Sequence, residues 1–392
     1  MTRQEYLEAA EKRYDELQRL NLITDFYDYE TEFVKIWQDL GREVLEKNIS
    51  KPGNDKRKKN LTTLGYVTIN NTHPFSKGKN GFQISPKLQE LMIYSAQTDS
   101  YENCNEVLEK YINIEVSAAQ VWRVANVYGE EVGKTISDEV VLTPCKKEEV
   151  IYAMADGSMI FTREEGWKEV KVGRIFKSSS CIHADDKQGW ISNSQYLAYL
   201  DTHKRFTTEM EKLLDHYSQN KQPIVFISDG APWIKNWIED AYPEAISVLD
   251  FYHASEHLHD YAKTEIKDET QRKQWVDRHL ELLLNGEVQK IIDELSSVLV
   301  ISEQAEKLID YYESNKTRMD YPLYKKLGAG IIGSGAIESA HRTVVQKRMK
   351  QSGQRWSRKG AQNMLYLRVT KKNHQWSKIV ELTKKEFCKT AA

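Results

Sequence analysis

The sequence predicts a mixed α/β protein (α+β overall) with an N-terminal helical domain and an all-helical insertion. Three observations predict this class. Apolar residues recur at helical spacing in residues 4–48 and 86–132. Short apolar segments of strand type alternate with helical segments between residues 150 and 250. Residues 255–325 are charged, helical in pattern and free of strand signals. The sequence therefore predicts at least one helical domain together with a sheet that is covered by helices.

The first helical segment is followed by weaker signals. Tyr6 and Tyr14 belong to an apolar stripe at helical spacing, and residues 49–60 form a basic loop rich in helix breakers. Residues 61–83 alternate around Asn70-Asn71, which predicts a small β element there.

The region 86–132 has the pattern of a helix-turn-helix. Helices are expected over Leu88–Ala96 and Ser100–Tyr111, and Ser117 is expected to cap a third helix over Ala118–Gly129. In this interpretation the last helix directs three polar side chains toward base edges, namely Gln120, Arg123 and Asn126. A three-helix bundle with no DNA contact gives the same pattern, so both interpretations stay open.

After a charged linker the periodicity changes to that of strands. The expected order is three strands in series, a helix, and then strands alternating with helices, which describes a mixed sheet flanked by helices. These segments are Val150–Ala155, Lys168–Phe176, Trp190–Leu200, the helix Thr202–Tyr217, Pro223–Ser228 and Ala245–Leu249. A helix from about Ala336 to Gln351, ended by Gly353, follows the helical insertion. The predicted domains are 1–146, 147–254, 255–325 and 326–392.

Composition excludes several classes of protein. The chain has 392 residues, of which 29% are charged, and no apolar run approaches the 18 or so residues of a membrane span. Its start mixes both charge signs, unlike a secretory signal. The four cysteines, Cys104, Cys145, Cys181 and Cys388, are far apart and form no C-x-x-C pair. We therefore expect a reducing cytoplasm and no disulfide framework.

Charge is distributed unevenly along the chain. Residues 339–392 hold 14 Lys and Arg but 2 Asp and Glu, whereas the rest holds 42 basic and 56 acidic residues. A stretch with a net charge of +12 suggests contact with a polyanion. A solvated basic helix face is the alternative explanation.

Three acidic residues are candidates for metal-dependent chemistry. Asp156 and Asp229 each follow an apolar strand segment as an Asp-Gly pair, and Glu338 lies in the first turns of the late helix. Ligands of such sheets bind at the carboxyl ends of strands. Three carboxylates from separate elements suit two Mg²⁺ or Mn²⁺ ions, which activate a nucleophile and stabilise a leaving oxygen. Structural alternatives remain, because Asp-Gly is a common turn and the helix dipole favours an acid near a helix start.

Basic residues surround and follow Glu338. Their pattern predicts salt-sensitive phosphate contacts, with Trp356 stacking on an unpaired base. The residues concerned are Arg342, Lys347, Arg348, Lys350, Arg355, Trp356, Arg358 and Lys359. Ordinary core packing is the alternative for Trp356.

His253-x-x-Glu256-His257 is a competing motif, because some zinc peptidases use H-x-x-E-H. The motif comes almost directly after a predicted strand end, whereas zinc hydrolysis needs it inside a regular helix. It also leaves the two Asp-Gly pairs unexplained.

Taken together, the motifs resemble the DDE transposases of bacterial insertion sequences, of the ISKra type allied to the Mutator-like clan. The matching segments are Ala155–Gly157, Glu165–Gly173, Ser228–Ile234, Leu249–Leu258, Ile332–Ala340 and Met349–Ser357. The resemblance implies an RNase H-like catalytic domain with a helical insertion and a triad of Asp156, Asp229 and Glu338. Asp250 and His253 match an Asp-x-x-His element near the active site.

The resemblance also implies a function and partners. The expected activity is Mg²⁺-dependent cleavage of transposon ends and strand transfer into target DNA, by at least a dimer, in the nucleoid of a bacterium. The N-terminal helical region would bind the terminal repeats. An RNase H-like nuclease without strand transfer, a DNA-binding protein without chemistry and a zinc hydrolase are the alternatives.

Overall fold

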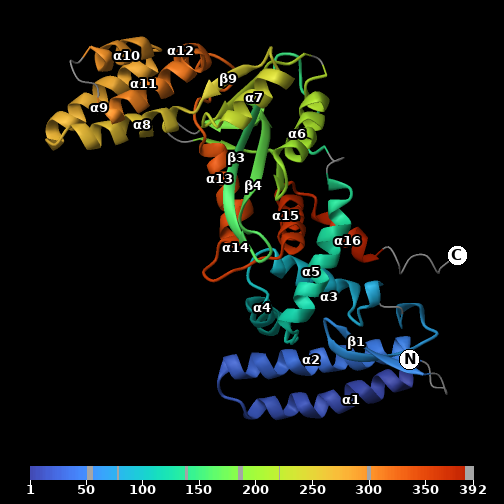
Figure 1. Ribbon diagram of the computed structural model, residues 1–392. Coiled ribbons are helices and arrows are strands. Elements are labelled where there is room, and N and C mark those ends of the chain that lie inside the picture. The colour runs from blue at the N-terminus through green and yellow to red at the C-terminus, as the bar shows by residue number, and fades with distance from the viewer. Residues whose placement is uncertain are drawn as a thin grey trace. The chain divides into compact units, whose positions relative to one another are not determined.

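The structure is a computed structural model that describes residues 1–50, 56–76, 79–136, 140–183, 189–219, 221–297 and 302–384 (Figure 1). The chain divides into two compact units: Met1–Thr135 with Tyr366–Ala392, and Ile136–Leu365. Residues 366–392 therefore group with the N-terminal region, although the sequence analysis assigns them to the catalytic domain. Within the described residues we find no helix with the length and apolar character needed to cross a membrane.

The first unit begins with a helical hairpin of α1 (Arg3–Arg19) and α2 (Phe26–Ile49). Thr2 starts α1 with a capping box, and the Asp25 carboxylate accepts a hydrogen bond from the Asp28 N–H at the start of α2. The helical structure predicted for residues 4–48 is confirmed.

The predicted β element is an antiparallel hairpin of β1 (Arg57–Thr62) and β2 (Gly65–Asn70). Its turn lies at Thr63 and Leu64 and not at Asn70-Asn71. The Thr62 hydroxyl donates to the Gly65 carbonyl and accepts from the Leu64 N–H, and Gly65 adopts a φ of 103°, which favours glycine.

Three short helices follow: α3 (Pro86–Ala96), α4 (Asn103–Ile112) and α5 (Ala118–Gly133). Ser117 caps α5 as predicted, and Val121 and Val124 on α5 are fully buried. The arrangement is the predicted helix, turn and capped helix, which a helix-turn-helix and a plain three-helix bundle share. The unit is completed by α16 (Trp376–Lys384), where the Trp376 indole N–H donates to Glu90 on α3.

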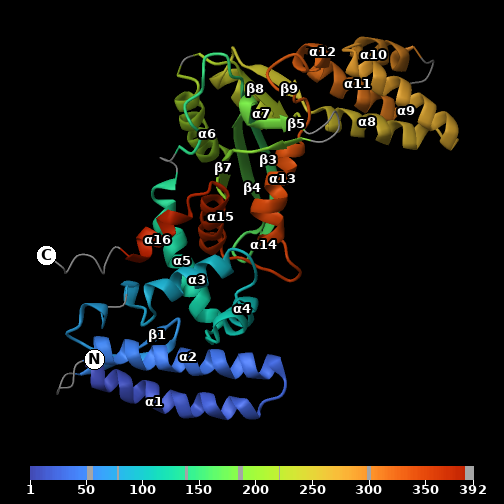
Figure 2. The same ribbon diagram turned by 180° about the vertical axis from the view of Figure 1, so that it is seen from behind.

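The second unit is built on a mixed five-stranded sheet in the order β7-β4-β3-β8-β9 (Figures 1 and 2). Its strands are β3 (Ile151–Thr162), β4 (Gly166–Lys177), β7 (Gln195–Tyr199), β8 (Ile224–Ser228) and β9 (Ile246–Leu249). The first three are antiparallel neighbours, and β8 and β9 run parallel to β3. The mixed sheet flanked by helices is thus confirmed. The predicted strand from Trp190 to Leu200 is in fact two strands, β6 (Gly189–Ile191), which pairs with β5 (Cys181–His183), and β7.

Helices cover both faces of the sheet. The Cα of Gly173 on β4 faces the side chains of Phe206 and Met210 on α6 (His203–Tyr217), and a Cβ there would lie 2.9 Å from the Met210 sulfur. The next residue, Arg174, donates to the Ala336 carbonyl at 2.8 Å on α13 (Gly335–Ala340). Because successive residues of a strand point to opposite faces, α6 and α13 cover opposite faces. A second helix, α7 (Pro232–Ala241), connects β8 to β9.

The helical insertion begins at Phe251, earlier than the predicted residue 255. It consists of α8 (Phe251–Glu265), α9 (Glu269–Leu284), α10 (Val288–Ser296), α11 (Glu303–Asn315) and α12 (Tyr321–Tyr324). These helices are amphipathic, and they bury Leu258, Leu283, Ile291 and Tyr312 in a core of their own.

The predicted late helix is present but is not regular. After α13 the segment His341–Gln346 winds as a π-helix, α14 (Lys347–Met349) follows, and Gly353 comes after the helix end with a φ of 73°. Single π turns inside α-helices occur frequently at functional sites. The chain then enters α15 (Arg358–Lys372).

Candidate active site

Asp156 on β3 and Asp229, the residue directly after β8, occupy equivalent positions relative to the ladder between these two strands. The parallel ladder between β3 and β8 ends at the pair Met154 and Ile227. Each aspartate comes two residues after that pair, so each belongs to the same side of the sheet as the last paired residues. Neighbouring strands lie about 4.8 Å apart, so the register leads both carboxylates to one region at the carboxyl end of β8.

The predicted end of β3 at Asp156-Gly157 is wrong, because β3 continues to Thr162. The reason is β4, which pairs with β3 along its whole length, with Asp156 opposite Val172. The two strands therefore extend beyond the sheet as a long hairpin, and Asp156 lies within a strand at the point where its parallel neighbour stops.

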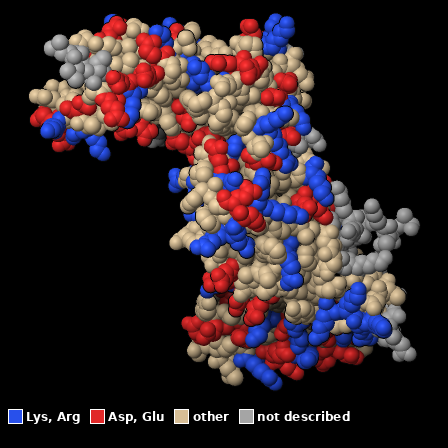
Figure 3. All heavy atoms as spheres, in the orientation of Figure 1, with Lys and Arg blue, Asp and Glu red and all other residues tan. Residues whose placement is uncertain are grey.

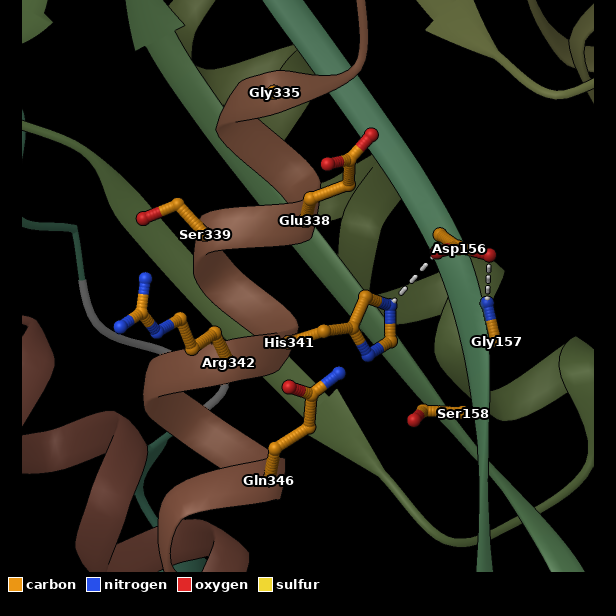
Figure 4. A pocket seen from close by; sticks show the side chains of 9 residues that line it. All are labelled: Asp156, Gly157, Ser158, Gly335, Glu338, Ser339, His341, Arg342 and Gln346. Atoms are coloured by element: carbon orange, nitrogen blue, oxygen red, sulfur yellow. Dashed lines mark hydrogen bonds and ion pairs between the residues drawn. The ribbon is translucent and has the colours of Figure 1, made fainter. Parts of the chain in front are cut away.

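Asp156 and Glu338 face each other across one pocket of about 500 Å³ between β3 and the late helix (Figure 4). The pocket is lined by Asp156, Gly157, Ser158, Gly335, Glu338, Ser339, His341, Arg342 and Gln346. Asp229 does not line it. Two of the three predicted catalytic carboxylates thus share a polar pocket, and a base from the predicted phosphate-binding set, Arg342, contributes to its wall.

His341 lies directly against Asp156. Its Nε2 is 3.2 Å from the Asp156 carboxylate, and its ring is buried, with a side-chain exposure of 5%. The Nδ1 atom is buried without a hydrogen-bond partner among the described residues. Burial alone would raise the pKa of the Asp156 carboxyl, but the contact and charge of His341, the Gly157 N–H and the charge of His253 together lower it. Asp156 is therefore ionised at neutral pH.

Glu338 is linked to Asp250 through one serine. The Ser334 hydroxyl donates to the Glu338 carboxylate at 2.7 Å, and the Ser334 N–H donates to Asp250 at 2.8 Å. Asp250 is fully buried and also caps α8 by accepting from the Tyr252 and His253 N–H groups. This one carboxylate therefore fixes the start of the insertion and the start of α13 together.

His253 completes the link between these acids. Its Nδ1 lies 2.6 Å from Asp250. This hydrogen bond, opposed by burial and helped by the charges of Asp250, Asp229 and Glu256, raises the pKa of His253 to about 9. Burial would raise the pKa of the Asp250 carboxyl, but hydrogen bonds from His253 and Ser334 outweigh it and lower that pKa. The charge of the protonated imidazole interacts with Asp156 and with Asp229, as expected of a residue that supports the active site.

Two buried arginines position the elements that carry the acids. Arg318, which follows α11, donates to the Ser228 hydroxyl at 2.7 Å at the end of β8 and to the Ser247 hydroxyl at 3.0 Å on β9. Arg174 on β4 holds the first turn of α13 through the Ala336 carbonyl. Asp229 follows the strand end that Arg318 fixes, and its carboxylate accepts from the Ala231 N–H at 3.0 Å.

The donor set matches a hard divalent cation in type. Carboxylate oxygens from three elements are the ligands that Mg²⁺ and Mn²⁺ prefer. Among the described residues, no three acidic, histidine or cysteine side chains lie close enough together to hold one ion. The match therefore rests on donor chemistry, ionisation and the shared strand register.

The zinc-type motif was expected to lie outside a regular helix, but His253, Glu256 and His257 lie inside α8, so this expectation is wrong. Their contacts nevertheless serve other purposes. His253 is bound to Asp250, and the His257 ring packs on Tyr311 with ring centroids 3.9 Å apart.

The predicted DNA-contacting residues fall into two groups. Arg348 is fully buried with its guanidinium over the Trp356 ring, and Trp356 is 7% exposed with its indole N–H bonded to the Met349 carbonyl. The prediction that these two side chains contact DNA is therefore wrong, because both are packed in the core. The remaining residues of the C-terminal set are exposed: Arg342, Lys347, Lys350, Arg355, Arg358 and Lys359. Of these, Arg358 is paired with Glu165 at 2.6 Å.

On α5 the three predicted side chains have local partners. Gln120 closes the capping box with Ser117, Arg123 donates to the Ala119 carbonyl, and Asn126 donates to the Trp122 carbonyl. Arg123 is exposed, whereas Gln120 and Asn126 are half-buried.

Sequence reasoning assigned no role to His341, Ser334, Arg174 or Arg318. A signal existed for His341, since it follows Glu338 by three residues and so shares its helix face. Ser334 likewise precedes Glu338 by one turn. No local pattern could have identified the two arginines, because their partners are on distant segments.

Comparisons with known proteins agree on one family. The model of the uncharacterised protein family UPF0236 matches residues 75–386. A protein of Streptococcus gallolyticus described as "UPF0236 protein in vanSb 3′ region" is 23% identical over 298 residues, which cover 74% of this chain and 64% of that protein. The chain thus spans about 64% of the length of this curated relative. With a match over most of its length, including every element of the pocket, this chain belongs to the uncharacterised protein family UPF0236.

Proposed function

We propose that this protein is the DNA transposase of a bacterial insertion sequence, of the ISKra type, and that it cleaves and joins DNA strands by a DDE mechanism. The observation that carries the proposal is the strand register. It gives Asp156 and Asp229 equivalent positions at one end of the sheet, where Asp156 and Glu338 line the same pocket. A mixed sheet of three antiparallel strands followed by two parallel strands is also the framework that the RNase H-like resemblance implies.

The roles of the three acids follow from their surroundings. Asp156, Asp229 and Glu338 would hold two Mg²⁺ or Mn²⁺ ions, and when bound these would activate the attacking oxygen and stabilise the leaving oxygen at phosphorus. Asp156 is held ionised by His341. Ser334 orients the Glu338 carboxylate, and Asp250 holds Ser334 and His253 in place.

The exposed bases next to the pocket would bind the DNA backbone. Arg342 lines the pocket, and Lys347 on α14 and Lys350 directly after α14 are exposed. Contacts of this kind are independent of sequence and weaken steeply with salt. Recognition of terminal repeats would then fall to the N-terminal region, where Arg123 is the exposed member of the predicted base-contacting set.

The experiment combines cleavage with a joining assay. The full chain is incubated with Mg²⁺, a supercoiled target plasmid and labelled double-stranded DNA taken from the two flanks of its own coding region, either intact or pre-cut. We expect cleavage and joined products from the natural chain. Asp156→Asn, Asp229→Asn and Glu338→Gln should each lower both by at least about 10³-fold, because each removes a charged ligand from the site, while DNA affinity is kept. Glu209→Gln is the control, since Glu209 pairs with Lys212 on α6, which covers the opposite face of the sheet.

The outcomes separate the proposed activity from its alternatives. Full activity in any of the three variants would contradict the catalytic assignment. Cleavage without joined product from pre-cut ends would indicate a nuclease. Loss of activity in His257→Ala with zinc found by metal analysis would favour the zinc hydrolase.

A further inference from the structure

Large apolar side chains are exposed in one short part of the first unit. Among the described residues, 22 large hydrophobic side chains are exposed, and nine of them lie between Tyr6 and Trp37. Monomeric proteins rarely expose apolar side chains in contiguous groups of this kind, and such groups mark interaction surfaces.

Seven of these nine side chains form one face of the α1–α2 hairpin. Each helix buries little: Ala9 and Arg13 on α1, and Ile36 and Leu40 on α2. Next to these buried residues, each helix carries a second, mostly apolar stripe that is open to solvent. Its residues follow the helical spacing i, i+4, i+7 and i+11. The two stripes are Arg3-Leu7-Ala10-Tyr14 on α1 and Phe26-Glu30-Phe33-Trp37 on α2.

The two open stripes lie on the same side of the hairpin. On each helix the open stripe is reached by turning about the helix axis, in the direction of increasing residue number, away from the buried residues. Because the two helices run in opposite directions, these turns lead to the same side of the hairpin. The ring contacts of Tyr29 with Phe33 (6.3 Å) and of Phe33 with Trp37 (6.1 Å) continue along this side. We name this surface the hairpin face, defined by Tyr6, Leu7, Tyr14, Phe26, Phe33, Val34 and Trp37.

Charge argues against DNA as the occupant of the hairpin face. Residues 1–49 contain 7 basic and 12 acidic residues, a net charge of −5. By helical spacing, the acidic residues of α1 and α2 lie outside the two apolar stripes, with the exception of Glu30. Figure 3 shows a face of α1 and α2 on which acidic and basic side chains gather. An acidic segment with one apolar side fits a protein partner and not a polyanion.

The hairpin face has the size needed to pair with a second copy of this chain. Exposed fractions of 37–75% on its seven side chains correspond to roughly 500–800 Å², against about 800 Å² per partner in a standard interface. A two-fold axis in the plane of this face would lay the same apolar surface of each copy on that of the other.

We propose that the protein is a homodimer in which two α1–α2 hairpins pack on each other through the hairpin face and form a four-helix bundle. This proposal does not depend on the proposed chemistry. The family match begins at residue 75, so the dimer would be formed by a segment outside the matched region.

The test is the oligomeric state of the full chain, measured by sedimentation velocity between about 1 and 50 µM. We expect a dimer for the natural chain and, for Phe26→Glu with Trp37→Glu, at least a hundredfold weaker association, because two aromatic anchors are lost. Both side chains are at least half exposed, so the fold should be kept, as circular dichroism would verify. Leu323→Glu, at an apolar position of α12 with 49% exposure, is the matched control and should leave the dimer unchanged. A monomeric natural chain, or a dimer that is unaffected by the Phe26 and Trp37 changes, would overturn the proposal.

Discussion

Replacing Asp250 by Asn should weaken the fold of the second unit in a pH-dependent way. The substitution keeps the shape and the capping ability of the residue but removes its charge. Asp250 accepts four hydrogen bonds, from the Tyr252, His253 and Ser334 N–H groups and from the His253 ring. An amide has a single acceptor oxygen, so at least one bond is lost and the others lose their charge assistance. At about 1.5–3 kcal/mol for a hydrogen bond to a charged group, we expect a loss of roughly 2–4 kcal/mol at pH 6.

The pH dependence follows from His253. Its pKa is about 9 in the folded protein and 6.5 in the reference state. A raised folded-state pKa stabilises the protein fully below pH 6.5, and this contribution disappears as the pH rises through 9. The difference corresponds to about 3 kcal/mol if fully realised. Because the His253 side chain is 39% exposed, screening by solvent reduces this to about 1–2 kcal/mol.

The assay is a double-mutant cycle of Asp250→Asn and His253→Gln, with urea unfolding at pH 6.0 and at pH 9.5 or above. The unfolding of the first unit is common to all four proteins, so its contribution cancels in the cycle. We expect a coupling free energy of about 1–2 kcal/mol at the lower pH and close to zero at the higher pH. A coupling that is absent at pH 6, or equal at both pH values, would refute the assigned ion pair.

Two further predictions concern the loop that leads into α13 and the contact of β4 with its first turn. Gly330→Ala should destabilise the protein by about 1–3 kcal/mol in thermal unfolding, because Gly330 has a φ of 66° and a Cβ would lie 2.7 Å from the Lys325 carbonyl oxygen. Gly335→Ala is its control, since nothing lies within 4 Å of an added Cβ at this first residue of α13, so the stability should change little. Arg174→Met should cost about 1.5–3 kcal/mol of stability, because the Ala336 carbonyl loses its charged donor. It should also lower the proposed DNA cleavage in the plasmid assay, and a variant that cleaves as well as the natural chain would show that this contact does not position the helix.

Much of the fold could be predicted because its elements are locally encoded. Ser117 with Gln120 forms a capping box, and the apolar stripe of α5 then has the expected buried side. The late helix was also placed correctly, but its π turn was not, because no local residue pattern marks where a helix adds one residue to a turn.

The candidate site was predicted less completely because its geometry depends on distant partners. The charge and aromatic character of the segment with Arg348 and Trp356 predicted a DNA surface, yet the two side chains stack on each other in the interior. A basic, aromatic composition is compatible with a surface and with a buried cation–π pair, and only the fold distinguishes them.

The position of Asp156 illustrates how tertiary pairing overrides a local signal. An Asp-Gly pair after an apolar segment favours a turn, and the turn would have placed the carboxylate at a strand end. The equally long β4 instead keeps β3 extended to Thr162. The other neighbour of β3 is shorter, since β8 ends at Ser228 and the parallel ladder stops at Met154. The chain leaves β8 at Asp229-Gly230, where Gly230 has a φ of 87° that favours glycine. The difference in length between the two strands therefore brings an aspartate inside one strand and an aspartate just after the other to the same part of the sheet.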